Sequence, residues 1–271
     1  FSYYYDSGNG QIKQPPVNAQ GEALSLEELF AMEREESEYS GPQQAEPVEL
    51  DETVDENGLR HIKAADVDEF LAAIADNTVI ELTGELYDLS TAADYGAFGS
   101  ENYYWFNGYD GPGLVISGVE NLPIVCNGAV MSAIPRYANV LGFVNCRGIT
   151  LEGFTAGHTQ EPGSCAGGVL DFANCEEVDV LSCRLYGCGI FGISASGCRE
   201  LCVEKTEIYE CSQGAIFLYS TENASFADCD IHDCYSPEIS ISDCTGVSYD
   251  GEHLNYGIFK IENGKPVVFE W

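Results

Sequence analysis

The sequence predicts an all-β solenoid, in which the chain winds into stacked coils of about 23 residues. One observation behind this prediction is a fixed repeat, because similar residues recur every 23 positions. The other is the alternation of apolar and polar residues within each repeat, which is typical of strands with one side chain inside and the next outside. Residues that are one repeat apart form a column, and two columns show the repeat most clearly. One contains Cys175, Cys198, Thr221 and Cys244, and the other contains Ile193, Ile216 and Ile239.

A repeat of this length cannot bury its apolar face alone, so successive coils must stack about 4.8 Å apart. The columns resemble those of the right-handed parallel β-helix of pectin-lyase-like proteins. The block that runs from PRYANV through GHTQEPGSCAGGVL to LYGCGIFGI is similar to β-helix repeat proteins of gut bacteria, over roughly residues 61–245. This resemblance implies a right-handed parallel β-helix of single coils. It implies no catalytic residues, because the fold hosts lyases, hydrolases, adhesins and inert spikes.

We expect the chain to have two parts. Residues 1–60 form an acidic, mostly irregular N-terminal extension with one short helix that begins at Ser25. Residues 61–271 form the β-helix. A helix with Asp66 as its N-cap covers the first coil, and a hairpin that turns at Asn263–Gly264 covers the last. Such caps are needed because an open end would expose apolar side chains and strand edges.

The chain is strongly acidic, with 45 acidic and 11 basic residues and a formal net charge of −34. This charge excludes nucleic acid as a partner, because phosphate binding needs a basic surface, and it disfavours anionic membranes. No apolar stretch is long enough to span a membrane, and the numbered chain shows no signal peptide. We expect a monomer that is secreted or held at the cell surface, with a polysaccharide or oligosaccharide as its partner.

Many of the twelve cysteines follow the same period as the rest of the repeat. We expect them to be reduced fillers of the core, because free cysteine is among the most buried residue types. No CxxC pair indicates a zinc site. The interpretation of the cysteines as core fillers rests mainly on one column, which contains Cys165, Cys188, Cys211 and Cys234.

An insertion marks one side of the predicted solenoid. Equivalent residues are 29 apart from Ala156 to Leu185 but 23 apart from Cys165 to Cys188, so the extra residues lie in GHTQEPGS. Insertions in a solenoid form loops on one face, often the binding face. A histidine here suits general acid or base chemistry, with a carboxylate partner and an arginine for an anionic group. The candidate catalytic residues are therefore His158, Glu161, Asp171 and Arg136.

An aromatic segment precedes the insertion and is too long and irregular for a turn. Its rings could form a stacking wall for a sugar chain, and the candidate substrate-binding residues are Tyr104, Trp105 and Tyr137. The alternative is that His158 bonds loop backbone groups, Arg136 pairs with a nearby carboxylate, and the rings are simply packed.

The repeat also places four carboxylates on neighbouring coils: Glu207, Glu210, Asp230 and Asp233. Crowded carboxylates repel one another and could recruit calcium, a hard cation that prefers oxygen ligands. No DxDxDG loop accompanies them. The alternative is a solvated acidic strip that Arg184 neutralises at one end.

Together these features predict a carbohydrate-directed protein that binds or processes a polysaccharide. An enzyme of this kind would be a polysaccharide lyase or a glycoside hydrolase. Of the motifs used by polygalacturonase-type glycosidases of this fold, only GHT is present and RIK is absent. The alternative function is a structural or adhesive surface module without catalysis, whose partner is another protein.

Overall fold

The computed structural model describes residues 48–97, 99–126, 128–159, 164–187 and 189–269, together with two short strands near the N-terminus. These are β1 (Tyr5–Asp6) and β2 (Gln11–Ile12), which pair with each other in antiparallel fashion. The helix predicted at Ser25 lies outside the described residues. The chain divides into two compact units, Phe1–Ala45 and Glu46–Trp271.

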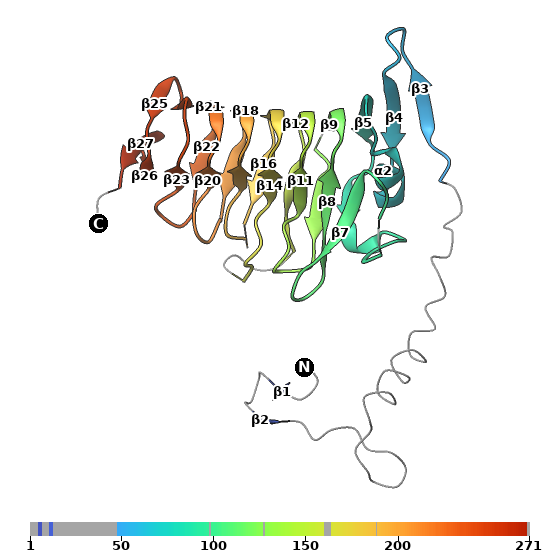
Figure 1. The fold of residues 1–271 in the computed structure, drawn as a ribbon, viewed down its shortest axis with the longest axis horizontal. Helices are drawn as coiled ribbons and strands as arrows, with labels where there is room; N and C mark the ends of the chain where they lie inside the picture. Colours follow the sequence, from blue (N-terminus) through green and yellow to red (C-terminus); the bar gives the residue numbers. More distant parts are fainter. Residues whose placement is uncertain are drawn as a thin grey trace. The chain divides into compact units, whose positions relative to one another are not determined.

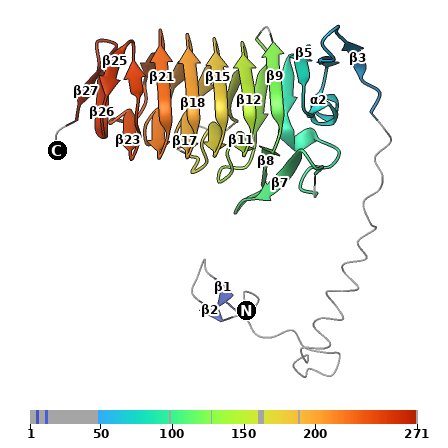
Figure 2. The ribbon, with the colours of Figure 1, turned by 45° about the horizontal axis from the view of Figure 1, so that its top comes forward.

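The second unit is a solenoid with three sheets, in which most strands pair in parallel with their equivalents on the neighbouring coils and antiparallel strands lie at the ends (Figures 1 and 2). Sheet I contains β6 (Leu86–Asp88), β10 (Val130–Ala133), β13 (Thr155–His158), β16 (Arg184–Tyr186), β19 (Glu207–Tyr209) and β22 (Asp230–His232). Sheet II contains β7 (Tyr103–Asn107), β8 (Pro112–Ser117), β11 (Leu141–Val144), β14 (Leu170–Ala173), β17 (Ile193–Ser196), β20 (Ile216–Tyr219), β23 (Ile239–Ser242), β26 (Gly257–Glu262) and β27 (Lys265–Val268). Sheet III contains β3 (Asp51–Val54), β4 (Arg60–Ala64), β5 (Thr78–Leu82), β9 (Glu120–Cys126), β12 (Arg147–Glu152), β15 (Glu176–Leu181), β18 (Arg199–Glu204), β21 (Glu222–Ala227), β24 (Val247–Tyr249) and β25 (Glu252–Leu254).

The parallel pairing follows the repeat that the sequence predicts. Ile193 pairs with Ile216 and Ile216 with Ile239, each 23 residues further along the chain. The two earlier steps are longer, since Leu114 pairs with Leu141 and Leu141 with Leu170. The all-β architecture with stacked parallel strands is therefore confirmed.

Strand alternation builds the core, because every second side chain of a strand points inside the solenoid. Equivalent residues then stack on one another along the interior. Phe143 of β11 and Phe172 of β14 are both buried, and their rings stack with centroids 5.2 Å apart.

Two of the three corners of each coil are tight, and the third is long. Between sheets II and III the chain turns at a left-handed residue, such as Asn145 with φ 55° or Asn174 with φ 53°, and a second one follows three residues later. Between sheets III and I it also turns at a left-handed residue, as at Ser182 with φ 53°. The extra length of a coil therefore falls in the corner between sheets I and II, where β13 and β14 are joined by residues 159–169.

Buried thiols fill the tight corners, as the periodic cysteines predict. Cys198 lies with its Sγ 3.6 Å from the carbonyl oxygen of Ser196 and 3.4 Å from that of Phe172 on the preceding coil. Thr221, one coil later, bonds the equivalent carbonyls through its hydroxyl. The expectation that all the cysteines are reduced is wrong, however, because Cys165 is disulfide-bonded.

Other elements lie at the two ends of the solenoid. Helix α2 (Val67–Ala73) has Asp66 as its N-cap, whose carboxylate accepts the Glu69 amide at 2.9 Å. It packs beside β4 and β5, and its role as a cap of the first coil stays a prediction. The strand β3 pairs with β4 and so belongs to the second compact unit, while the boundary expected at residue 61 stays a prediction. At the other end β26 and β27 form a hairpin through Asn263 and Gly264, both in the left-handed region.

Candidate functional site

A shallow groove of about 200 Å³ lies on the outer face of sheet II. One wall is β7, which pairs antiparallel with β8 at the edge of the sheet (Figure 1). Alternation along β7 turns Tyr104 and Phe106 outward, with 38% and 56% of their surface exposed. It turns Tyr103 and Trp105 inward, where both side chains donate hydrogen bonds to the carboxylate of Asp94, at 2.7 and 3.1 Å. Trp105, 5% exposed, is thus part of the core. Phe106 occupies the place in the wall that was expected for Trp105 from the sequence.

The floor of this groove is a row of outward side chains that crosses four strands. Tyr104 pairs with Val115, Val115 with Gly142, and Gly142 with Asp171. A Cβ added at Gly142 would lie 3.2 Å from the Val115 side chain, so the glycine keeps the floor low between the aromatic wall and Asp171. Asn139, on the loop that borders the groove, is fixed because its side-chain oxygen accepts the Gly168 amide at 2.7 Å.

Asp171 is the only ionisable side chain other than Tyr104 among the described residues that line the groove. It is partly buried, and this burial raises the pKa of its carboxyl group. No hydrogen bond or ion pair joins it to any described residue. A carboxylate that has lost part of its water and gained no protein partner is well placed to bind hydroxyl or amine groups of a ligand.

Arg136 and Tyr137 lie at the rim, on the long corner that joins sheets I and II. The carboxylate of Asp110, at the tip of the β7–β8 hairpin, accepts the backbone amides of Arg136 and Tyr137 at 2.8 and 3.1 Å. The Arg136 guanidinium pairs with the same carboxylate at 3.6 Å. The Tyr137 ring packs against Tyr109, with centroids 5.2 Å apart. Neither side chain lines the groove.

His158 lies inside the solenoid, 1% exposed at the end of β13. Its Nε2 is 2.9 Å from the carbonyl oxygen of Ala138, which only accepts, so Nε2 carries the proton. Burial lowers the pKa of the ring and keeps it neutral. Its Nδ1 is buried and has no partner among the described residues. The histidine thus fixes the bordering loop from inside, while Glu161 lies outside the described residues.

Of the residues selected from the sequence, the structure therefore brings together Tyr104 and Asp171. It places Arg136, Tyr137, His158 and Trp105 elsewhere, and it adds Phe106. Consecutive residues of a strand point to opposite faces, so this alternation could have identified Phe106 in place of Trp105.

Two side chains, Arg184 and His232, pair with part of the acidic strip on sheet I. Glu207 pairs with the Arg184 guanidinium at 2.5 Å and with Nε2 of His232 at 3.1 Å. Nδ1 of His232 lies 2.8 Å from the Asp233 carboxylate. Asp230 lies beside Glu207 on the adjacent strand. Among the described residues no group of three His, Cys, Asp or Glu side chains is arranged to hold a metal ion, so calcium binding by Glu207, Glu210, Asp230 and Asp233 stays a prediction without geometric support.

A larger hollow, of about 960 Å³, lies on the outer face of sheet III near β4 and β5. Its charged side chains, including Lys63, Glu81 and Glu152, are exposed and therefore solvated. Among its described lining residues no carboxylate is partly buried, and the partly buried Cys126 is a weak hydrogen-bonding group, so the smaller groove on sheet II is the better candidate site.

The comparisons with known proteins agree with the architecture. Residues 163–268 match the family model of the right handed beta helix region. This match covers the regular coils and the C-terminal hairpin, where it agrees with the observed stacking of parallel strands, and it names no ligand. No curated protein matches the chain. The described part of the β-helix protein contains no helix that is both long and apolar enough to cross a membrane.

Proposed function

We propose that this β-helix protein binds carbohydrate in the groove on sheet II. The observation behind the proposal is Asp171, a partly buried carboxylate that has no hydrogen bond or ion pair with any described residue and lines the groove opposite the aromatic side chains of β7. Aromatic faces such as those of Tyr104 and Phe106 stack on the apolar faces of sugars, while a carboxylate accepts hydrogen bonds from their hydroxyl groups. A groove on the side of a solenoid also suits an extended chain.

Binding without cleavage is the better-supported form of this function. Glycoside hydrolysis ordinarily uses two carboxyl groups on either side of the scissile bond. The described residues of the groove supply one, Asp171, and the ring of His158 is enclosed in the core. The disulfide at Cys165 fits an oxidising compartment, which supports the secreted or cell-surface location expected from the sequence.

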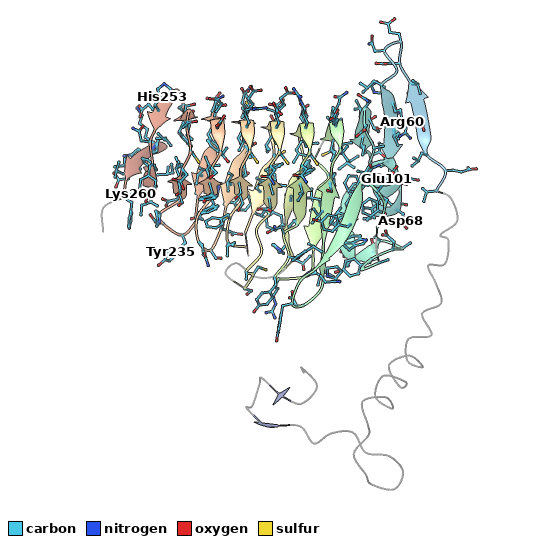
Figure 3. All side chains as sticks on the ribbon, viewed as in Figure 1. Arg60, Asp68, Glu101, Tyr235, His253 and Lys260 are labelled. Atoms are coloured by element: carbon cyan, nitrogen blue, oxygen red, sulfur yellow. The ribbon has the colours of Figure 1, made fainter. Side chains whose placement is uncertain are left out.

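The test is a glycan array, probed with and without calcium, followed by titration of the best ligand. Tyr104→Ala, Phe106→Ala and Asp171→Ala should each weaken binding about tenfold or more. The two aromatic variants lose stacking on the sugar. Asp171→Ala loses a hydrogen bond to a charged group, which contributes about 1.5–3 kcal/mol, and tenfold is about 1.4 kcal/mol. Tyr235→Ala is the matched control, since this tyrosine is 69% exposed on a later corner of the solenoid (Figure 3). Equal affinities for all four variants would place the ligand elsewhere.

The second candidate is a module that binds another protein, and one observation favours it. Tyr109 and Tyr137, 85% and 51% exposed, pack together beside the groove and leave an aromatic surface in water. Tyrosine is enriched at protein interfaces because its ring supplies contact area at a low cost in entropy. A complete lack of glycan binding would leave this candidate as the better one.

A further inference from the structure

Two cysteines at the long corners of successive coils form a pair. Cys211 follows β19 and Cys234 follows β22, and they are 23 residues apart (234 − 211), one coil of the solenoid. Cys165 is two coils before Cys211 (211 − 165 = 46) in the same column of the sequence, and it is disulfide-bonded. The column therefore already contains one oxidised cysteine.

The two backbones are in register at this point. The Tyr235 amide donates to the Cys211 carbonyl oxygen at 2.8 Å, and each thiol lies near a carbonyl of sheet I, Cys211 near Tyr209 and Cys234 near Ile208. The thiols of Cys211 and Cys234 are also close enough to influence each other's pKa. Neighbouring strands are about 4.8 Å apart, within the Cα separation of about 4.4–6.8 Å that a disulfide spans.

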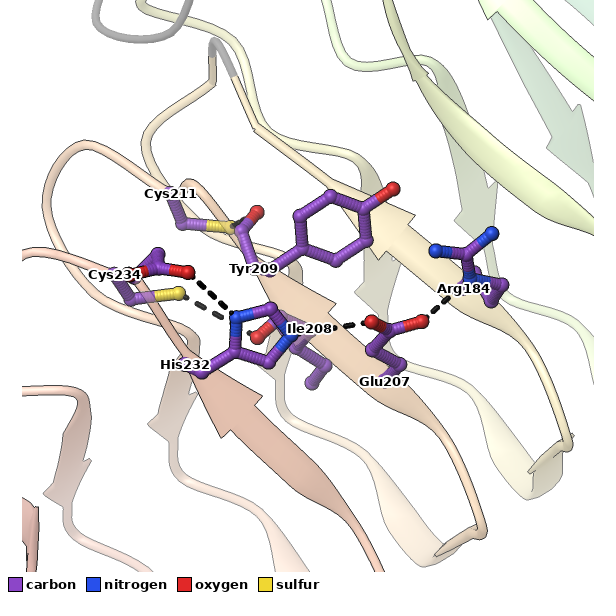
Figure 4. Close-up of polar contacts among 8 residues, drawn as sticks. Arg184, Glu207, Ile208, Tyr209, Cys211, His232 and Cys234 are labelled. Carbon is purple, nitrogen blue, oxygen red and sulfur yellow. Dashed lines mark hydrogen bonds and ion pairs between the residues drawn. The ribbon is translucent and has the colours of Figure 1, made fainter.

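The surroundings of Cys234 favour a reactive thiolate (Figure 4). Both nitrogens of His232 face carboxylate oxygens, which favours the doubly protonated, positively charged ring and raises its pKa. Interaction with Cys211 lowers the pKa of Cys234, and the nearby His232 adds to this effect, although burial and the Glu238 carboxylate act in the opposite direction. Reactive cysteines are found in such settings, close to a cation and partly exposed.

Accessibility separates this pair from the other neighbouring thiols. Cys234 is partly exposed, whereas Cys211 beneath it is 1% exposed. Cys175 and Cys198 are also one coil apart, but each is 2% exposed, so a dissolved oxidant cannot reach either sulfur. Within this pair, Cys234 is therefore the sulfur that a dissolved oxidant meets first.

We propose that Cys211 and Cys234 are an oxidisable dithiol that closes a second disulfide between coils by exchange with a small-molecule disulfide. The Cys234 thiolate attacks one sulfur of that disulfide, forms a mixed disulfide and releases one thiolate. The Cys211 thiol then loses its proton to solvent and attacks the Cys234 sulfur, which releases the second thiolate. Two protein thiols are oxidised and one small-molecule disulfide is reduced to two thiols, so electrons and atoms balance.

The test treats the full chain with oxidised glutathione and maps its peptides by mass spectrometry without reduction. We expect a peptide that joins Cys211 to Cys234 and appears only after treatment. Cys211→Ser should instead accumulate glutathione on Cys234, and Cys234→Ser should show neither the link nor glutathione on Cys211. Cys202→Ser is the matched control, because Cys202 is partly exposed but faces outward from β18, and it should form the link as the wild type does.

Circular dichroism of each variant first checks that it is folded. The link should also raise the midpoint of thermal unfolding, since a cross-link restricts the unfolded chain. Thiols of Cys211 and Cys234 that remain free in the folded wild type, or glutathione that stays on Cys234 of the wild type, would overturn the proposal.

Discussion

At the scale of the residue, neighbours along a column decide what a side chain does, and His232 is an example. Its ring continues a stack that begins with Tyr186 and Tyr209, and the planes of Tyr209 and His232 are 8° from parallel with centroids 5.3 Å apart. Asp233 and Glu207 hold the ring from its two nitrogens. Gly157 is the equivalent of Tyr186 on the preceding coil. Only glycine fits there, because a Cβ would lie 2.5 Å from the Tyr186 ring.

This geometry predicts a pH dependence of stability. The hydrogen bonds to Asp233 and Glu207 raise the pKa of His232 in the folded state above its value of about 6.5 in the unfolded chain. A raised pKa means that the folded state holds the proton more tightly. The stabilisation is therefore complete below about pH 6.5 and is lost as the pH rises through the folded-state pKa.

The measurement is the urea midpoint of unfolding at a series of pH values from mildly acid to mildly alkaline. The wild type should lose more stability over this range than His232→Gln does. His253→Gln is the control, because His253 forms no ion pair within the described residues and lies on β25, away from sheet I (Figure 3). Parallel pH profiles for the wild type and His232→Gln would contradict the assignment.

At the scale of the element, close approach between corners shapes the groove. The amides of Ala166 and Gly167 both donate to the Arg136 carbonyl oxygen, at 2.7 and 2.8 Å. A Cβ at Gly167 would lie 1.9 Å from the Ala138 carbonyl oxygen, the atom that also accepts from His158. Glycine at 167 thus allows one long corner to pack directly on the next.

Gly167→Ala should therefore lower the free energy of unfolding by about 1–3 kcal/mol, the usual cost of overpacking a tight site. It should also weaken glycan binding, because Ala138 borders the groove. Gly251→Ala is a control with open space around its Cβ and a φ of 79°, and it should cost about 1 kcal/mol through the left-handed backbone alone, with no effect on binding. Denaturant unfolding and ligand titration of both variants measure the difference.

The repeat made the elements easier to predict than the site. The period fixes which residues stack, so the pairing of Ile193 with Ile216 and the place of the insertion could be read from the columns. The period gives the insertion's position in the sequence, but it does not show at which corner of the fold that segment lies or which way its side chains point. His158 was therefore expected at the surface, although its place in β13 turns it inward. The disulfide at Cys165 was also missed, because equal spacing fits both a buried thiol and a cross-link.

At the scale of the whole molecule, net charge is the dominant electrostatic feature. With 45 acidic and 11 basic residues, at most a quarter of the carboxylates can pair with a lysine or arginine. Some do, for example Glu177 with Arg147 at 2.6 Å and Glu207 with Arg184 at 2.5 Å, but these pairs are exposed and contribute about 0–1 kcal/mol each. Repulsion among the remaining carboxylates therefore opposes the compact state.

Salt should consequently stabilise this protein. Between roughly 0.01 and 1 M sodium chloride the Debye length falls from about 30 to about 3 Å, so repulsion across the surface is screened. The midpoint of thermal unfolding should rise over this range, although the exposed ion pairs alone would predict a fall. Calcium chloride at matched ionic strength separates screening from site binding: an additional rise that Glu207→Gln and Asp230→Asn remove would reveal a calcium site on sheet I. Equal midpoints in the two salts would indicate screening alone, and a midpoint that falls with sodium chloride would show that ion pairs outweigh the net charge.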